Sequence, residues 1–357
     1  QENDVVKNIK ATISSGIWSG GTGTLTTFFS QSANSSSAGK YYYDVYKTNP
    51  STDTEAEVQF SIGYGHLEGS GSLGTVGGSS GNRASAAIHA QLVNLLLPPN
   101  KDRFTYAGSV TSKHFFVVSL KRSRMREKMD PGNWELRISG SNKNVGENIR
   151  LIDDSNSTTD PDAGIGGRVF NVVSGSITSG TTSIETAASS NPGGGFGLFY
   201  PDLGIILLNA DIVNASASIS VNTTSDTDGG NVPQFFNSIK GGAYFQARRE
   251  EKLSSTHYFV RAGNKEFNFS NNPTFFTAST GDFTQPTFFK DPKVYITTVG
   301  LFNDSNELLA VAKLSQPVLK SYSREALIKV RCLEVWHYQN LLGIVVEHSI
   351  IYQHIIC

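Results

Sequence analysis

The sequence predicts a mainly β protein, built of several antiparallel sheets or β-sandwich-like subdomains with one short helix. Two observations carry this prediction. Short runs rich in β-branched and aromatic residues recur along the chain, and clusters of Gly, Ser, Asn and Pro separate them, which is typical of strands joined by turns. Only residues 84–97 combine the residue types and the spacing of a helix.

Composition narrows the class of protein. At 357 residues the chain is long enough for a large core and for two or three domains or subdomains. Its 30 Lys and Arg residues nearly balance its 31 Asp and Glu residues, so no long-range attraction draws it to nucleic acid or acidic membranes. No apolar stretch is long enough for a spanning helix. Because the chain begins at Gln1 rather than Met, we expect that a segment preceded it.

The first predicted region, residues 1–113, is a Gly- and Ser-rich β region with one helix. Alternating patches such as "AEVQFSIGYGHLEG", residues 56–69, predict strands separated by short turns. The helix is predicted over residues 84–97 because Pro98 and Pro99 end it. Its apolar residues share one face: Ile88, Leu92, Leu95 and Leu96.

The second predicted region, residues 114–331, consists of one or more β-rich structural domains. Its first part predicts a strand, a basic segment over residues 121–128, a turn at "DPGNW" and a second strand. Residues 196–213 predict two short strands hinged at Pro201 and Asp202. A helical turn is predicted near residues 323–327, and Pro-Thr-Phe-Phe occurs twice, too few copies for a repeat protein.

A hairpin is predicted over residues 295–314. Two apolar runs flank the polar segment 303–307, whose Asn and Asp residues tolerate left-handed backbone and form local turns. The hairpin carries no reactive group, so we interpret it as a packing element. Four side chains are predicted to be buried by that packing: Val299, Leu301, Leu309 and Val311.

The third predicted region, residues 332–357, is an apolar C-terminal arm. It is too apolar to remain in water and too short to span a bilayer. We expect an extra strand or arm in a groove of its own or a neighbouring subunit; the alternative is an appended passenger. Its predicted packing residues are Ile344, Val346, Ile350 and Ile351, and Cys332 and Cys357 are expected to be thiols.

Candidate catalytic residues are few. Asp153, Asp154, Asp160 and Asp162 cluster as paired carboxylates would, but their Ser/Thr/Asn-rich surroundings favour a solvated loop. "GIGGR" precedes a β-branched run instead of a helix, which excludes a phosphate loop. The basic segment favours a solvated turn or a charged contact with a neighbouring subunit over nucleic acid.

Candidate metal ligands are also few. His66, His89, His114 and His257 are far apart in sequence, without a metal-binding motif. His337, His348 and His354 share the tail with both cysteines, but their spacing matches no zinc arrangement. We therefore expect no enzyme activity and no catalytic, cofactor-binding or metal-binding residues.

Three segments together resemble a family of virion structural proteins of contractile-tailed bacteriophages, especially phages of cyanobacteria. They are "KRSRMREKMDPGNWELRIS", "FGLFYPDLGIILLN" and residues 254–331, which include the hairpin. The resemblance implies a non-enzymatic subunit of the tail or baseplate, assembled into virions in the host cytoplasm. It implies other virion proteins and copies of the same chain as partners, and no nucleic acid, membrane, substrate or cofactor. It does not extend to residues 332–357.

Two further classes fit the same composition. A carbohydrate-binding or depolymerising tail protein would also be rich in strands and polar loops, with exposed aromatics such as Trp18 and residues 41–43. A cell-surface adhesin is the other class. Paired carboxylates in a groove would favour the depolymerising protein, and a secretion signal would favour the adhesin.

Overall fold

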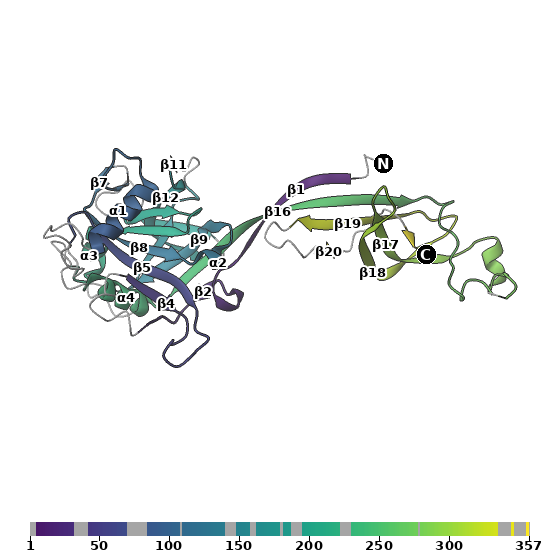
Figure 1. The fold of residues 1–357 in the computed structure, drawn as a ribbon, viewed down its shortest axis with the longest axis horizontal. Helices are drawn as coiled ribbons and strands as arrows, with labels where there is room; N and C mark the ends of the chain where they lie inside the picture. The colour runs from purple at the N-terminus through teal and green to yellow at the C-terminus, as the bar shows by residue number, and fades with distance from the viewer. Residues whose placement is uncertain are drawn as a thin grey trace. The chain divides into compact units, whose positions relative to one another are not determined.

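The computed structural model shows two compact units, with a mainly β fold (Figure 1). Unit 1 comprises Gln1–Ile13 and Lys252–Cys357, and unit 2 comprises Ser14–Glu251. The structure describes residues 5–31, 42–69, 84–107, 109–139, 148–157, 162–178, 181–186, 195–221, 230–277, 279–334, 344–345 and 355–356.

Most elements belong to unit 2. Its strands are β2 (Thr24–Leu25), β3 (Phe29–Ser30), β4 (Tyr42–Tyr46), β5 (Val58–His66), β6 (Thr105–Tyr106), β7 (Val110–Thr111), β8 (His114–Leu120), β9 (Lys128–Ile138), β10 (Ile149–Asp153), β11 (Asp162–Gly164), β12 (Gly167–Thr178), β13 (Thr181–Thr186), β14 (Gly197–Tyr200) and β15 (Ile205–Asn209). Its α-helices are α1 (Ala84–Leu96), α2 (Arg122–Met125), α3 (Ala210–Ala217) and α4 (Asn231–Gly242), and Ser19–Gly21 form a 3-10 turn.

Two strands, β1 (Val5–Gly16) and β16 (Phe245–Ala262), have residues in both units. The remaining elements belong to unit 1. They are the 3-10 turn Pro286–Phe289 and the strands β17 (Val294–Phe302), β18 (Leu308–Lys320), β19 (Ala326–Glu334), β20 (Ile344–Val345) and β21 (Ile355–Ile356).

The predicted boundary between residues 113 and 114 does not separate the two units. β5 and β8 lie on either side of it, yet they pair along their length, from Phe60 with Leu120 to His66 with His114. The two regions predicted from composition, residues 1–113 and residues 114–331, are therefore joined in unit 2 by the pairing of β5 with β8. The boundary at residue 331 is not a unit boundary either, because unit 1 continues from Lys252 to the C-terminus.

The main sheet of unit 2 is antiparallel and runs in the order β16-β9-β10-β12-β14-β15-β8-β5-β4-β3. Its central strands are apolar at successive positions because both faces are covered. Phe116 and Ile206 point to the core that contains α4, whereas Phe115 and Leu207 point to the core that contains α1. This explains the unbroken apolar runs of β8 and β15.

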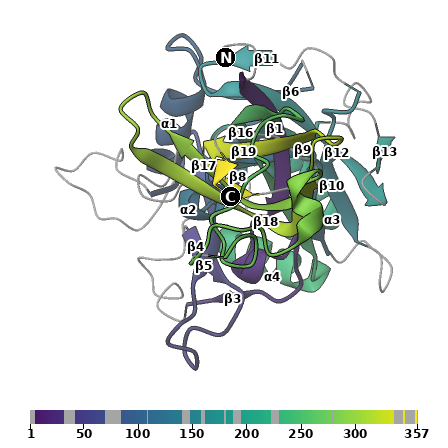
Figure 2. The same cartoon turned by 90° about the vertical axis from the view of Figure 1, so that its right-hand side faces the viewer.

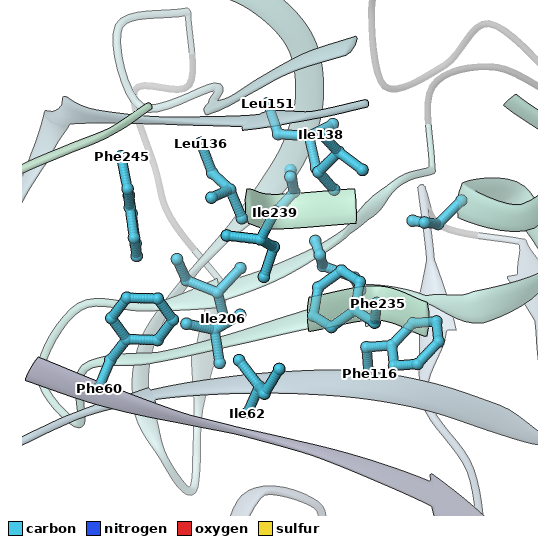
Figure 3. Packing of buried hydrophobic residues seen from close by; sticks show 14 of the residues in the cluster. Phe60, Ile62, Phe116, Leu136, Ile138, Leu151, Ile206, Phe235, Ile239 and Phe245 are labelled. Atoms are coloured by element: carbon cyan, nitrogen blue, oxygen red, sulfur yellow. The ribbon is translucent and has the colours of Figure 1, made fainter. Parts of the chain in front are cut away.

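α4 occupies the centre of the larger core. Figure 3 shows Phe235 and Ile239 of this helix lying between side chains of β5 and β8 on one side and side chains of β9 and β10 on the other. The Phe235 ring stacks on Phe116, with ring centroids 4.3 Å apart. In unit 2 the strands of the sheet thus surround α4, a helix that the sequence patterns did not predict.

The helix prediction was right for α1 and incomplete elsewhere. α3 begins directly after β15, where the Asn209 side chain accepts hydrogen bonds from the backbone N–H groups of Asp211 and Ile212. The structure therefore contains more than the one predicted helix. α4 has apolar residues spaced for one helical face, Val232, Phe235, Phe236 and Ile239, a pattern that could have identified it.

Two predicted turns take other forms. "DPGNW" lies inside β9 and bulges out of the ladder, because Met129 and Trp134 pair with residues of β16 only two positions apart. The predicted helical turn near residues 323–327 is instead a tight turn, with the Arg324 N–H donating to the Ser321 carbonyl over 3.1 Å, before β19 begins at Ala326. The hinge at Pro201 and Asp202, by contrast, connects β14 to β15 as predicted.

Unit 1 contains a third core, separate from the two cores of unit 2. The sheet β18-β17-β21 packs against β16 and β19, and Figure 2 presents β17 and β18 toward the viewer. The core residues are Ala262, Ile296, Val299, Leu301, Ala312, Ala326, Ile328, Val330 and Cys332. Small and branched side chains fill it, with no aromatic ring among these buried residues.

Candidate functional site

The predicted hairpin is confirmed, with β17 and β18 paired in antiparallel register. Its turn is organised by Asn303, whose side-chain oxygen accepts hydrogen bonds from the N–H groups of Ser305 (3.0 Å) and Glu307 (2.8 Å). Asn306 takes the left-handed backbone conformation expected of a turn Asn, with φ of 58°. The polar segment 303–307 is therefore the turn of the hairpin, stabilised by the side chain of Asn303.

The predicted burial of the hairpin side chains is half right. Val299 is fully buried and Leu301 is 9% exposed, whereas Leu309 and Val311 are 62% and 46% exposed. The register explains the error, because Val299 pairs with Ala312 and Leu301 with Ala310. Since side chains alternate along a strand, these alanines face the core and Leu309 and Val311 face away from it.

The outward side chains of β18 form an apolar surface, which we call the β18 surface and define as Leu308, Leu309 and Val311. β18 is also an end strand of its sheet order. Most of the exposed large apolar side chains among the described residues lie in unit 1. They are Val6, Ile13, Phe267, Phe269, Phe283, Phe289, Tyr295, Leu308, Leu309, Val311, Tyr322 and Leu327.

The two copies of Pro-Thr-Phe-Phe meet in this unit. Phe275 of the first copy stacks on Phe288 of the second, with ring centroids 5.0 Å apart. Phe269 stacks on Phe276, and Phe289 is 79% exposed. The segment between β16 and β17 is thus a small aromatic cluster that leaves apolar rings at the surface of unit 1.

The described parts of the C-terminal tail are the end of β19, residues 332–334, and the two short strands β20 and β21, all in unit 1. In β20, Ile344 pairs with Cys332 of β19, and in β21, Ile355 pairs with Val299 of β17. Cys332 is buried. Four predicted positions lie outside the described residues: Val346, Ile350, Ile351 and Cys357. For these the arm and the expected thiol stay predictions, and the tail histidines also lie outside the described residues.

Two members of the carboxylate cluster, Asp153 and Asp154, are buried and bind backbone and side-chain groups of neighbouring strands. Asp153 accepts hydrogen bonds from the Gly132 N–H through both oxygens, at 3.0 and 2.9 Å, and Asp154 binds the backbone and side chain of Asn171. Burial raises the pKa of Asp153 above its usual value. The predicted solvated loop is therefore wrong at these two residues: Asp153 holds the bulge of β9 at Gly132, and Asp154 holds β12 at Asn171. Asp160 lies outside the described residues, and Asp162 belongs to β11.

Histidines that are far apart in sequence meet at one end of β5 and β8. Tyr64 Oη lies 2.7 Å from His114 Nδ1, and His114 Nε2 lies 2.8 Å from Asp211 Oδ1. Ser112 Oγ donates to the other Asp211 oxygen over 2.6 Å, and the His66 ring centroid lies 5.4 Å from that of His114. The hydrogen bond from His114 holds the pKa of Asp211 below its usual value.

This polar cluster was missed because the pairing of His66 with His114 depends on strand register, which the sequence does not specify. Both ring nitrogens of His114 are engaged, one by Tyr64 and one by Asp211. Ser112 contacts the carboxylate rather than the imidazole, so the order of a serine hydrolase triad is not reproduced. The cluster's evident contribution is to tie β5, β8 and α3 together.

The basic segment also differs from its prediction. Residues 122–125 form the single turn α2, which buries Met125 completely. Arg124 forms an ion pair with Glu57, and Arg126 with Glu251 (3.2 Å). The predicted solvated turn is therefore a helical turn anchored to acidic residues of its own chain.

The aromatics proposed for glycan binding are mostly buried. Trp18 is 2% exposed and its indole N–H donates to the Phe245 carbonyl over 3.0 Å, while Tyr43 packs edge-on against Phe236. Tyr42 alone of this set is exposed, and Tyr41 lies outside the described residues. A stacking platform for sugars is not formed by these rings.

No group of three or more His, Cys, Asp or Glu side chains in the described ranges is placed to hold a metal ion. Among the same residues, each helix is too short or too polar to cross a membrane. The fold and its surfaces define a mainly β protein of two units, with the apolar β18 surface in unit 1. Comparison with protein-family models, curated proteins and solved structures finds no match.

Proposed function

We propose that this chain is a non-enzymatic structural subunit of a contractile-tailed phage virion, placed in the tail or baseplate. It acts by packing against other virion proteins and against copies of itself. The proposal rests on the resemblance of three segments to that family and on one structural observation, the apolar β18 surface. The proposed compartment is the virion, assembled in the host cytoplasm.

The β18 surface supports a packing role because the hairpin does not need it for its own core. Val299, Leu301 and Ala312 already supply the buried side of the hairpin. Leu309 and Val311 lie on the other side, on an end strand of the sheet order. Exposed apolar side chains on such a strand are a hazard in a lone protein and a means of association in an assembly.

Charge supports the same role. The chain carries a net charge of −1, so copies repel one another little when they are packed together. Most of the exposed large apolar side chains of the described residues belong to unit 1, whereas unit 2 buries two continuous cores. We therefore assign the main contacts with neighbours to unit 1.

Replacing Leu309 with Asp should disrupt assembly and leave the isolated chain folded. Because Leu309 is exposed, the variant should lose less than about 1 kcal/mol of folding stability. At the centre of an interface the same change should cost at least about 2 kcal/mol, a roughly thirtyfold weaker association. Thermal unfolding measures the first quantity, and the native mass of the purified complex measures the second.

Leu95→Asp is the matched control, since Leu95 is an exposed leucine of α1 in unit 2. It should assemble as the parent chain does. Equal incorporation of Leu309→Asp and the parent into a megadalton particle would contradict the assignment of the β18 surface. A parent chain that stays monomeric with every co-expressed virion protein would contradict the proposed function itself.

A further inference from the structure

A polar cavity lies within unit 2, between the 3-10 turn Ser19–Gly21 and α2. Its volume is about 410 Å³, in the range of pockets that hold small ligands. Its lining includes Trp18, Gly20, Gly21, Glu57 and Ser123. Four cationic side chains complete the lining: Lys121, Arg124, Arg126 and Arg249.

The cavity has an excess of positive charge. Glu57 pairs with Arg124, while Glu251 pairs with both Arg126 (3.2 Å) and Arg249 (2.5 Å). Glu57 of the lining and Glu251, which pairs with two lining arginines, therefore offset two of the four cationic charges, which leaves a surplus of two positive charges. A ligand with two negative charges would neutralise the site.

Two of the three guanidinium groups are largely withdrawn from water, whereas the side chain of Arg126 is 49% exposed. The side chains of Arg124 and Arg249 are 14% and 19% exposed. Burial lowers the pKa of Arg124 below its usual value, because removal from water disfavours the charged form. An anion in the cavity would add to the ion pairs that Glu57 and Glu251 make with these groups. The planar guanidinium fork matches the oxygens of phosphate and carboxylate.

The backbone around the cavity is also unusual. Arg126 has φ of 59° and ψ of −95°, a conformation that a non-glycine residue adopts only at a cost of about 1–3 kcal/mol. Gly20 and Gly21 have φ of 77° and 73°, and a Cβ at either position would meet no atom within 4 Å. The strain places one guanidinium at the cavity, and the glycines leave their backbone open to a ligand.

We propose that this cavity binds a small molecule carrying a doubly charged oxyanion, either a phosphate group or a pair of carboxylates. The site consists only of residues of unit 2 and does not depend on the β18 surface. The proposed packing subunit would then also carry a ligand site. Binding there would offset the positive charge around α2 and thereby stabilise this region.

The test is isothermal titration of the full-length chain at low ionic strength, with inorganic phosphate in one arm and succinate in the other. We expect saturable binding in at least one arm with a Kd of about 1 mM or tighter, and no binding of chloride. The arm that binds identifies the class of anion. Absence of saturable binding in both arms overturns the proposal.

Arg126→Gly is the decisive variant, because glycine accepts the local φ and the variant should therefore fold at least as well as the parent. It should weaken anion binding at least about tenfold, as expected for the loss of one charged hydrogen-bonding group. Lys121→Ala should weaken binding as well. Unchanged binding by Arg126→Gly overturns the proposal.

Arg122→Ala is the matched control. Arg122 belongs to the same helical turn and has the same charge, but it donates to the Asp202 carbonyl and does not line the cavity. Its removal should leave binding unchanged. An equal loss with Arg122→Ala would show attraction to general surface charge and would overturn a defined site.

Discussion

Replacing Phe235 with alanine should lower the free energy of unfolding of unit 2 by about 3–5 kcal/mol. Phe235 is fully buried in α4, stacks on Phe116 at 4.3 Å and lies between strands on opposite sides of the core (Figure 3). Truncation removes the ring and leaves a cavity that a sheet held by hydrogen bonds on both sides cannot close. Urea unfolding followed by tryptophan fluorescence measures the loss, since Trp18 and Trp134 belong to the same core.

Phe235→Leu retains most of the side-chain volume and should cost less than about 1.5 kcal/mol. Phe267→Ala is a second control, because Phe267 is an exposed phenylalanine of unit 1 and its removal should leave unit 2 unaffected. A loss below about 1 kcal/mol for Phe235→Ala would show that α4 is not the centre of the core.

Unit 2 should also lose about 3 kcal/mol of stability as the pH falls from 6.5 to 4, through His89 alone. Burial, followed by the charge of His66, lowers the pKa of His89 from 6.5 to about 4. Between these values the unfolded chain binds a proton that the folded chain does not, so stability rises with pH. The contribution is complete above pH 6.5 and is lost as the pH falls through the window, at about 1.4 kcal/mol per pKa unit.

His89→Leu should remove this slope. His89 Nε2 has no hydrogen-bond partner among the described residues, and the ring stacks on Phe115, so a leucine keeps the apolar contact. The measurement is the free energy of unfolding at several pH values between 4 and 7. Asn94→Leu, at an exposed position of the same helix, should keep the parent slope. A variant as pH-sensitive as the parent would assign the slope to other groups.

Local sequence patterns predicted the elements whose shape is set locally. The hairpin 295–314 follows from two apolar runs and an Asn-rich turn, and Asn303 supplies the turn through its own side chain. α1 follows from good helix formers that end at Pro98. In these segments neighbouring residues carry the information, so sequence and structure agree.

Features that depend on distant segments were not predictable in this way. α4 is short and contains Asn, Pro and Gly, and it is stabilised by the sheet that surrounds it rather than by its own propensity. Leu309 was predicted to face inward because it is apolar, but register placed Ala310 and Ala312 there instead.

The candidate sites show the same limit. Arg126 and Glu251 are 125 residues apart in sequence, and His114 and Asp211 are 97 residues apart. Each pair meets because strands or helices from separate segments become neighbours. The sequence supplied the residue types of the basic segment and the histidines, but only the fold shows which of them share a cavity or a cluster.

In the hairpin, small alanines serve the core while the larger Leu309 and Val311 lie outside it. The requirements of the core and the character of the outward surface therefore depend on different residues. Substitutions at the outward positions can accumulate without loss of the native state, whereas the alanines tolerate little change in volume. Related chains could therefore vary the outward face of this single strand through a few side chains while the core beneath keeps its packing.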